Sequence, residues 1–255
     1  MIKLKDWFVN IDLFDRNKNK IMMIAAQEKL NQLKDVNEWL YEVIKPFIKK
    51  RILEIGCGLG GFLKILNEKN HYEFIAGTEI ENSYFEKLNN QKKIKIINHN
   101  ILTDSLEELI NYQFDTVICL NVLEHIENDK EAFNRICEIP ISKGYIIILV
   151  PAFKFLFNKL DSNAGHFRRY SKKDFIYLCS QNKNIEIKKI FYFNFFGIFG
   201  WFINGKILKK NYLSNHLLDV FNFLVPVFKI TQLFTQYFFR FITYYYSTKK
   251  IVLYL

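Results

Sequence analysis

An acidic residue beside a glycine-rich turn is the first place in this sequence where chemistry is expected. Glu54 stands two residues before the first of four glycines, which occupy positions 56, 58, 60 and 61. The apolar residues before the turn predict a strand, and those from Phe62 onward predict a helix. A strand that turns through glycines into a helix lets the backbone approach a ligand at the helix N-terminus. The turn therefore predicts a site for a nucleotide-like small molecule.

The spacing of these glycines narrows the class of ligand. They follow neither the G-x-G-x-x-G spacing of dinucleotide sites nor the phosphate-loop pattern that ends in Lys-Ser/Thr. The carboxylate of Glu54 would repel a pyrophosphate and attract a cation, such as the amino group of an amino-acid-like ligand. A turn that only links strand to helix is the alternative, and Glu54 argues against it.

Two further motifs follow at the ends of later predicted strands. Glu79 lies about twenty residues beyond the glycines, where an acid typically accepts hydrogen bonds from ribose hydroxyls. The alternative is an exposed loop acid. The segment 121–126, NVLEHI, follows the fourth predicted strand.

The three motifs LEIGCGLG (53–60), GTEI (77–80) and NVLEH (121–125) together resemble class I S-adenosylmethionine-dependent methyltransferases, and NVLEH resembles their small-molecule branch. The resemblance covers about residues 30–255 and implies S-adenosylmethionine as the cofactor. The cofactor-binding residues that it implies are Glu54, Gly56, Cys57, Gly58, Gly60, Glu79, Ile80, Asn100, Ile101 and Asn121.

Individual roles follow from the same resemblance. Glu54 and residues 56–58 would receive the methionine portion, Glu79 the ribose, and Ile80 the adenine ring. Asn100 stands where the family usually has an aspartate for the adenine amino group, so this hydrogen bond would lack the assistance of a charge.

A loop rich in arginine is the predicted substrate side. The chain has six arginines among 36 basic residues, and two of the six are adjacent, at Arg168 and Arg169. Paired guanidinium groups favour planar, bidentate contacts with a phosphate or carboxylate. We therefore predict substrate contacts from Arg168, Arg169 and Tyr170. The alternative is that the arginines pair with Asp161 or Asp174 and hold the loop in place.

Two histidines are predicted as catalytic residues. His166 lies in the arginine loop and His125 beside the cofactor motifs, and either could act as a general base or bind substrate. A purely structural role is the alternative for each.

The acceptor is predicted from a second resemblance, over residues 150–210. This stretch is similar to a methyltransferase subgroup that accompanies glycosyltransferases of lipid-linked sugars. It implies a small-molecule or glycolipid acceptor. Two alternatives stay open, a hydrophobic quinone-like acceptor and a non-catalytic protein that binds S-adenosylmethionine.

The elements that must position these residues alternate regularly after residue 50. Strands are predicted at 51–55, 73–78, 94–98, 114–120, 144–150, 185–193 and 251–255, with helices between them. This alternation predicts an α/β protein with a doubly wound, mostly parallel, seven-stranded Rossmann-like sheet. We divide the chain into an N-terminal helical cap (1–50), a core (51–193), an aromatic helical insertion interrupted by Pro226 (194–247) and a last strand (248–255).

Charge and aromatic residues are concentrated near the end of the chain. From residue 191 onward there are seven basic residues against one acid, and 21 of the 43 aromatic residues. This composition predicts contact with an anionic membrane surface or a lipid-linked anion. Without a recognisable nucleic-acid module, we expect no nucleic-acid partner. The oligomeric state is left open.

The cysteines and the apolar runs of the sequence indicate the cellular compartment and whether a cysteine metal site is expected. The four cysteines, at 57, 119, 137 and 179, have no C-x-x-C spacing, which indicates reduced thiols and no metal site. Neither a secretion signal nor an apolar run of eighteen residues is evident. We therefore expect a cytoplasmic protein that rests at the inner face of a membrane.

Overall fold

The structure of the protein is a computed structural model that describes residues 18, 21–26, 28–82, 84, 88, 94–238 and 249–254. The first 17 residues of the predicted cap and residues 239–247 of the predicted insertion lie outside the described residues. Among those described, no helix combines the length and the apolar character needed to cross a membrane.

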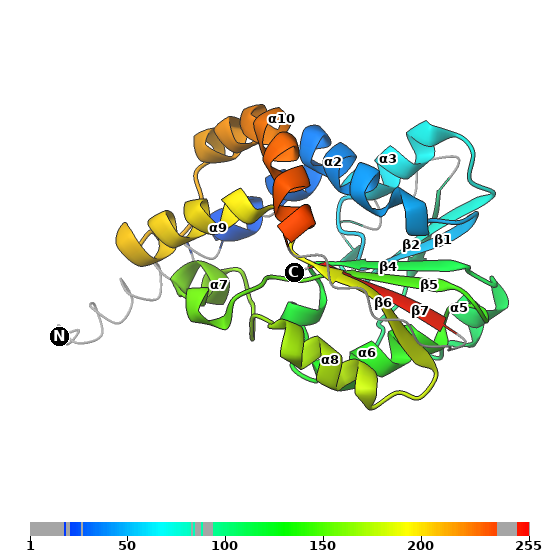
Figure 1. The fold of residues 1–255 in the computed structure, drawn as a ribbon. Helices are drawn as coiled ribbons and strands as arrows, with labels where there is room; N and C mark the ends of the chain where they lie inside the picture. Colours follow the sequence, from blue (N-terminus) through cyan, green and yellow to red (C-terminus); the bar gives the residue numbers. More distant parts are fainter. Residues whose placement is uncertain are drawn as a thin grey trace, which may run out of the picture.

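A seven-stranded sheet forms the centre of the molecule, with strand order β3-β2-β1-β4-β5-β7-β6. All six strand pairs are parallel, which confirms the predicted α/β fold with its doubly wound sheet (Figure 1). The strands are β1 (Arg51–Ile55), β2 (Phe74–Glu79), β3 (Lys95–Asn98), β4 (Thr116–Leu120), β5 (Tyr145–Leu149), β6 (Ile185–Phe191) and β7 (Lys249–Tyr254).

Alternate residues of each strand pack on opposite faces of the sheet, because side chains along a strand alternate in direction. Ile52 packs in the cluster formed with α2 (Lys34–Ile44) and α3 (Gly61–Lys69), whereas Leu53 packs in the cluster on the other face. That second face is covered by α5 (Glu107–Asn111), α6 (Asp129–Glu138) and α8 (Lys172–Ser180) (Figure 1). Burial on both faces explains why the strands read as continuous apolar runs.

The turn between β1 and α3 requires glycine for two reasons. Gly56 has φ +63°, a left-handed backbone that residues with a side chain rarely adopt. A Cβ atom at this position would lie 2.8 Å from Cγ2 of Val122, the residue after Asn121. The turn can therefore pass close under the end of β4 only because the side chain is absent.

The described part of the predicted insertion forms a helix that continues into a π-helical turn, followed after a short connection by a long helix. These are α9 (Phe195–Phe202), η4 (Ile203–Ile207) and α10 (Asn215–Phe238). Pro226 lies inside α10, so our expectation that it interrupts the helical segment is wrong. A proline removes one backbone hydrogen bond and bends a helix without ending it when packing holds both halves, and α10 bends along its length in Figure 1.

The segment before α2 joins the insertion to the glycine turn. Lys29 forms an ion pair of 2.6 Å with Asp219 on α10. Asn37 of α2 donates a hydrogen bond to the backbone carbonyl of Asn31, and this carbonyl oxygen lies where a Cβ atom at Gly61 would clash. The described part of the predicted cap thus lies between α10 and the start of α3.

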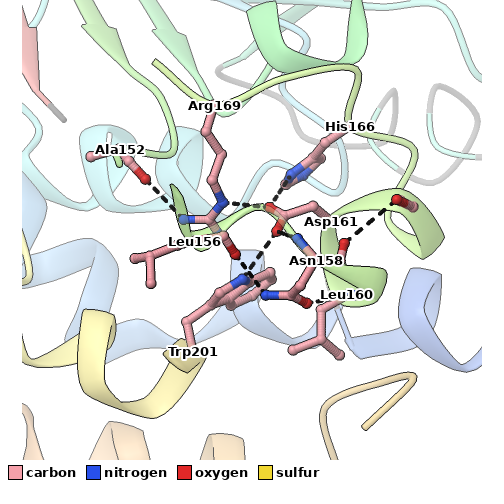
Figure 2. A network of polar contacts seen from close by, with 9 residues as sticks. Ala152, Leu156, Asn158, Leu160, Asp161, His166, Arg169 and Trp201 are labelled. Atoms are coloured by element: carbon pink, nitrogen blue, oxygen red, sulfur yellow. Dashed lines mark hydrogen bonds and ion pairs between the residues drawn. The ribbon is translucent and has the colours of Figure 1, made fainter. Parts of the chain in front are cut away.

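A buried carboxylate ties together the elements that follow β5. Asp161, on α7 (Lys159–Asn163), is fully buried and accepts four hydrogen bonds (Figure 2). The donors are Asn158 N (3.0 Å), Nδ1 of His166 (3.1 Å), Nε of Arg169 (2.7 Å) and Nε1 of Trp201 (3.2 Å). Burial alone would raise the pKa of Asp161, but the hydrogen bonds and the charge of Arg169 keep it below its usual value.

We predict that Asp161→Asn lowers the free energy of unfolding by about 3–5 kcal/mol, because it leaves the buried Arg169 without a charged partner. Urea denaturation measures this loss. Lys154→Ala is the matched control, since it breaks the exposed ion pair with Asp174 and should cost far less. Equal losses in the two variants would contradict a central role for the Asp161 carboxylate.

Candidate active site

A cavity of about 410 Å³ opens at the carboxyl ends of β1, β4 and β5. The strand order reverses between β1 and β4, the place where ligands of open parallel sheets bind. One wall carries Glu54 and the glycine turn, and another carries His125, His166 and Arg169. Aromatic side chains from the later elements line a further part, namely Phe153, Phe193, Trp201 and Phe221. The segment before α2 and α2 itself also line the cavity, among others with Met23, Leu30, Asn37 and Leu40.

Glu54 is a buried carboxylate with an unsatisfied oxygen on the cavity wall. Its side chain comes from β1, and within the described part of the chain its Oε2 has no hydrogen-bond partner. Burial, with a smaller contribution from the charge of Glu79, raises the pKa of Glu54 to about 8. A cation beside it would favour the charged form, so this wall suits a positively charged group.

The backbone N–H groups of the glycine turn are held by strand β2. Gly56 donates to Oγ1 of Thr78 at 3.2 Å, and Cys57 donates to the Thr78 carbonyl at 2.9 Å. Gly58 donates to a carboxylate oxygen of Glu79 at 2.8 Å. The turn is therefore already ordered by its own chain, and residues 56–58 line the cavity.

The predicted ribose ligand, Glu79, ends β2 and is itself buried. Its carboxylate accepts N–H groups from Gly58, Ile80 and Glu81, at 2.8–2.9 Å. A carboxylate has about four acceptor positions, so the described residues leave one for a ligand hydroxyl. Ile80 is largely exposed beside it, where its side chain is free to cover a flat ring.

Of the remaining predicted cofactor residues, only Asn121 lies on the cavity lining. Asn121 lies on the cavity wall in a left-handed conformation, with φ +52°. Asn100 lies outside the cavity lining, and its side-chain oxygen accepts from the N–H of Leu102 at 2.9 Å. Ile101 is buried in the core, and Gly60 provides a left-handed start for α3.

The two predicted catalytic histidines, which are 41 positions apart in the chain, meet on the cavity wall. Their ring centroids are 4.6 Å apart and the planes are nearly perpendicular, at 87°. His166 is oriented by Asp161 (Figure 2). Burial, and then the neighbouring charge of His166, lower the pKa of His125 to about 4, so its ring is neutral at neutral pH.

The predicted substrate residues are engaged by groups of the protein. Arg168 pairs with Asp129 at 2.5 Å and donates to the Glu127 carbonyl, and it lies outside the cavity lining. Tyr170 donates to Asp129 at 2.8 Å. Arg169 lines the cavity, but its Nε bonds Asp161 and its Nη1 bonds the Ala152 carbonyl. A role of these three residues in substrate binding stays a prediction.

Two residues of the site had no assigned role in the sequence analysis. Glu124 lies within the NVLEH motif and is fully buried. The motif follows a strand and shows neither strand alternation nor helix periodicity, so the sequence did not predict this burial. Trp201 stacks against Arg169 at 4.9 Å and donates to Asp161, although 40 positions separate Trp201 from Asp161 in the chain. No local signal connects residues so far apart.

Comparison with known proteins supports the assignment of the core. Residues 53–139 match a family model described as a methyltransferase domain. A ubiquinone biosynthesis O-methyltransferase of Rickettsia bellii is 28% identical over 154 residues, which are 54% of this chain and 62% of that enzyme. An uncharacterized protein of Methanocaldococcus jannaschii is 30% identical over 123 residues, which cover 45% of this chain and 49% of that one.

Among solved structures, CalS10 from Micromonospora echinaspora, an amino pentose methyltransferase bound to S-adenosylmethionine, has a TM-score of 0.42 and 16% identity. That alignment covers 51% of this chain and 56% of CalS10. The match to the Rickettsia enzyme spans about three fifths of its length. Residues 53–139 are thus similar to a methyltransferase domain, and the parallel sheet with a glycine turn at its switch point agrees with the fold expected from the sequence.

Proposed function

We propose that this protein transfers a methyl group from S-adenosylmethionine to a small-molecule or lipid-linked glycan acceptor. One observation carries the proposal: a single cavity joins Glu54 and the glycine turn to the two histidines. S-adenosylmethionine, when bound, supplies a methyl group on a positively charged sulfur. The chain's own task is then to hold the cofactor and the acceptor in line and to exclude water.

The cofactor side of the proposal rests on charge and shape. Glu54 would hold the ammonium group of the methionine portion, because its buried Oε2 lacks a partner among the described residues. Glu79 would use its remaining acceptor position for a ribose hydroxyl, and Ile80 would cover the adenine. Asn121, at the end of β4, would face the cofactor between them.

The acceptor side rests on the groups at the other end of the cavity. His125 and His166 are placed on its wall, where a neutral ring can take the proton of an attacking hydroxyl or amine. Phe153, Phe193 and Trp201 provide apolar surface for the body of the acceptor. Arg169 also lines the cavity, but its charge is offset by Asp161, so within the described residues it would contribute hydrogen-bond donors to the acceptor and little net charge.

A hydrophobic quinone-like acceptor is the second possibility. It is favoured by the aromatic lining and by the names of the Rickettsia relatives, which are ubiquinone biosynthesis O-methyltransferases. The two acceptors differ in the sugar and phosphate groups, which only the lipid-linked glycan carries.

We further propose that the helical insertion rests on an anionic membrane surface. Exposed apolar side chains on α9, η4 and α10 occur together with exposed lysines of the same segment. The apolar residues are Phe199, Phe202, Ile203, Ile207, Phe223, Val227 and Ile230, and the lysines are Lys206, Lys209 and Lys210. Apolar and basic residues in one segment are typical of helices that lie in a membrane interface.

The first prediction that follows from this proposal concerns protons released on cofactor binding. Glu54 has a pKa of about 8 without ligand, so at pH 6.5 it is mostly protonated. Binding a cation lowers this pKa and should release close to one proton per site, and affinity should rise as pH increases from 6.5 to 8. Calorimetry of S-adenosylmethionine binding in buffers of different ionisation enthalpy measures the release.

Glu54→Gln should bind more weakly at pH 8 and release no proton, whereas the exposed Glu73→Gln should behave like the wild type. If Glu54→Gln still released a proton, a group other than Glu54 would hold the ammonium of the methionine portion.

The second prediction concerns the acceptor. Purified protein is incubated with S-adenosylmethionine labelled in its methyl group, together with either extracted lipid-linked oligosaccharides or a hydroxylated benzoquinol. We expect label in the oligosaccharide lipid, and a loss of at least tenfold in Glu54→Gln but not in Glu73→Gln. Label in the benzoquinol alone would favour the second acceptor, and cofactor binding without label in either would indicate a non-catalytic protein.

The third prediction concerns the membrane. Vesicles containing phosphatidylglycerol should bind the protein more strongly than neutral phosphatidylcholine vesicles in a flotation assay. Phe223→Ser and Ile207→Ser should each weaken binding by about tenfold, because each removes an apolar side chain from the bilayer. Ile110→Ser, an exposed apolar site on α5, serves as the control. Equal binding to both kinds of vesicle would reject this surface.

A further inference from the structure

Three side chains with metal-binding atoms meet at one point on the cavity wall. They are Glu124, His125 and His166, and one ligand atom from each lies within 4.8 Å of the others. Glu124 and His125 belong to η2 (Leu123–His125), directly after β4, whereas His166 comes from the loop after α7. The constellation is thus made by two segments, and all three side chains line the cavity.

Glu124 is the member that most requires a partner. It is fully buried, and within the described part of the chain neither carboxylate oxygen accepts a hydrogen bond from another residue. A buried carboxylate in this state is costly unless a cation or a proton neutralises it. Because the Glu124 side chain also lines the cavity, a ligand in the cavity can reach these oxygens.

The nearest cation of the chain is already committed. Arg169 interacts with Glu124 electrostatically, but its Nε is bonded to Asp161 at 2.7 Å and its Nη1 to the Ala152 carbonyl at 2.9 Å. Asp161 and Arg169 offset each other's charge, so an ionised Glu124 would be left without a charge partner in this pocket. A divalent cation would neutralise it.

Both histidines are held in the manner of metal ligands. Nδ1 of His166 is hydrogen-bonded to Asp161 at 3.1 Å, which leaves Nε2 as the free ring nitrogen. His125 has a hydrogen bond with the backbone of Gly165. A metal-binding histidine almost always donates its second ring N–H to a carboxylate or a backbone carbonyl, because this bond orients the ring and selects the tautomer.

We propose that Glu124, His125 and His166 bind one divalent transition-metal ion, with open coordination positions toward the cavity. Two imidazole nitrogens and one carboxylate oxygen suit first-row ions from Mn²⁺ to Zn²⁺ better than Mg²⁺. Ligand atoms about 2.1 Å from a common ion lie about 3–4 Å apart, so side-chain shifts of under about an ångström close the site.

With the ion bound, both ring nitrogens of each histidine are used, so the ion would take over from the histidines in activating the acceptor. An oxygen of the acceptor could bind the ion at an open coordination position, which would lower the pKa of a hydroxyl group and orient it. This role rests on the proposed methyl transfer, whereas binding of the ion does not. The two can therefore be tested separately.

The test uses the full chain after treatment with EDTA and removal of the chelator. Mn²⁺ binding is followed by the electron paramagnetic resonance signal of the free ion. We expect one Mn²⁺ per chain, and a loss of affinity of more than about 100-fold in Glu124→Gln and in His166→Asn. His71→Asn, an exposed histidine outside the cavity lining, is the matched control and should bind like the wild type.

A second measurement needs no variant. Co²⁺ added to the wild type should shift two exchangeable ring N–H protons in the proton NMR spectrum, one from each histidine, because each ring is held through its other nitrogen. No stoichiometric Mn²⁺, no shifted ring protons, or unchanged binding in Glu124→Gln would each overturn the metal site. Calorimetry with S-adenosylmethionine on the metal-free protein tests the cofactor site independently, since loss of one binding with the other intact identifies which proposal fails.

Discussion

The cavity wall that carries His166 and Arg169 depends on the four hydrogen bonds to one buried carboxylate, Asp161. This side chain connects α7, the loop with His166 and Arg169, and Trp201 on α9, which otherwise belong to separate segments (Figure 2). A carboxylate can make these bonds only as an anion, and the hydrogen bonds together with Arg169 keep its pKa low enough for that. The loop is thereby held over the cavity without a contribution from any ligand.

The same cavity contains two buried glutamates with carboxylate oxygens that have no hydrogen-bond partner among the described residues, one oxygen of Glu54 and both of Glu124. Glu54 lies on the cofactor side and Glu124 on the acceptor side, and burial raises the pKa of each to about 8. Elsewhere the fold provides partners for buried carboxylates, as it does for Glu79 and Asp161. Leaving two acids unpartnered in one cavity is a large energetic cost, and the economical explanation is that cations complete both positions when the site is filled.

How far the site could be predicted depends on how local its signals are. The glycine turn, Glu79 and NVLEH each lie at the end of a strand, and parallel strands bring such ends to one edge of a sheet. His166 was singled out from its loop, but its proximity to His125 could not be inferred. The two adjacent arginines were singled out only because arginine is rare in this chain. Residue type does not show whether a guanidinium group contacts a ligand or, as here, the internal partners Asp129 and Asp161.

The strand and helix pattern, the order of the elements and the residues at the glycine turn were determined by the sequence itself, because periodicity and positive φ are properties of neighbouring residues. The prediction that Pro226 interrupts the helical segment was wrong, because a helix can continue past a proline when both of its halves are packed against the protein. Only the tertiary structure decided which polar side chains are satisfied. Burial and hydrogen-bond partners come from segments far apart in the chain. They distinguish the arginines, which are bonded to carboxylates, from Glu54 and Glu124, whose buried oxygens have no hydrogen-bond partner in the part of the chain that the structure describes.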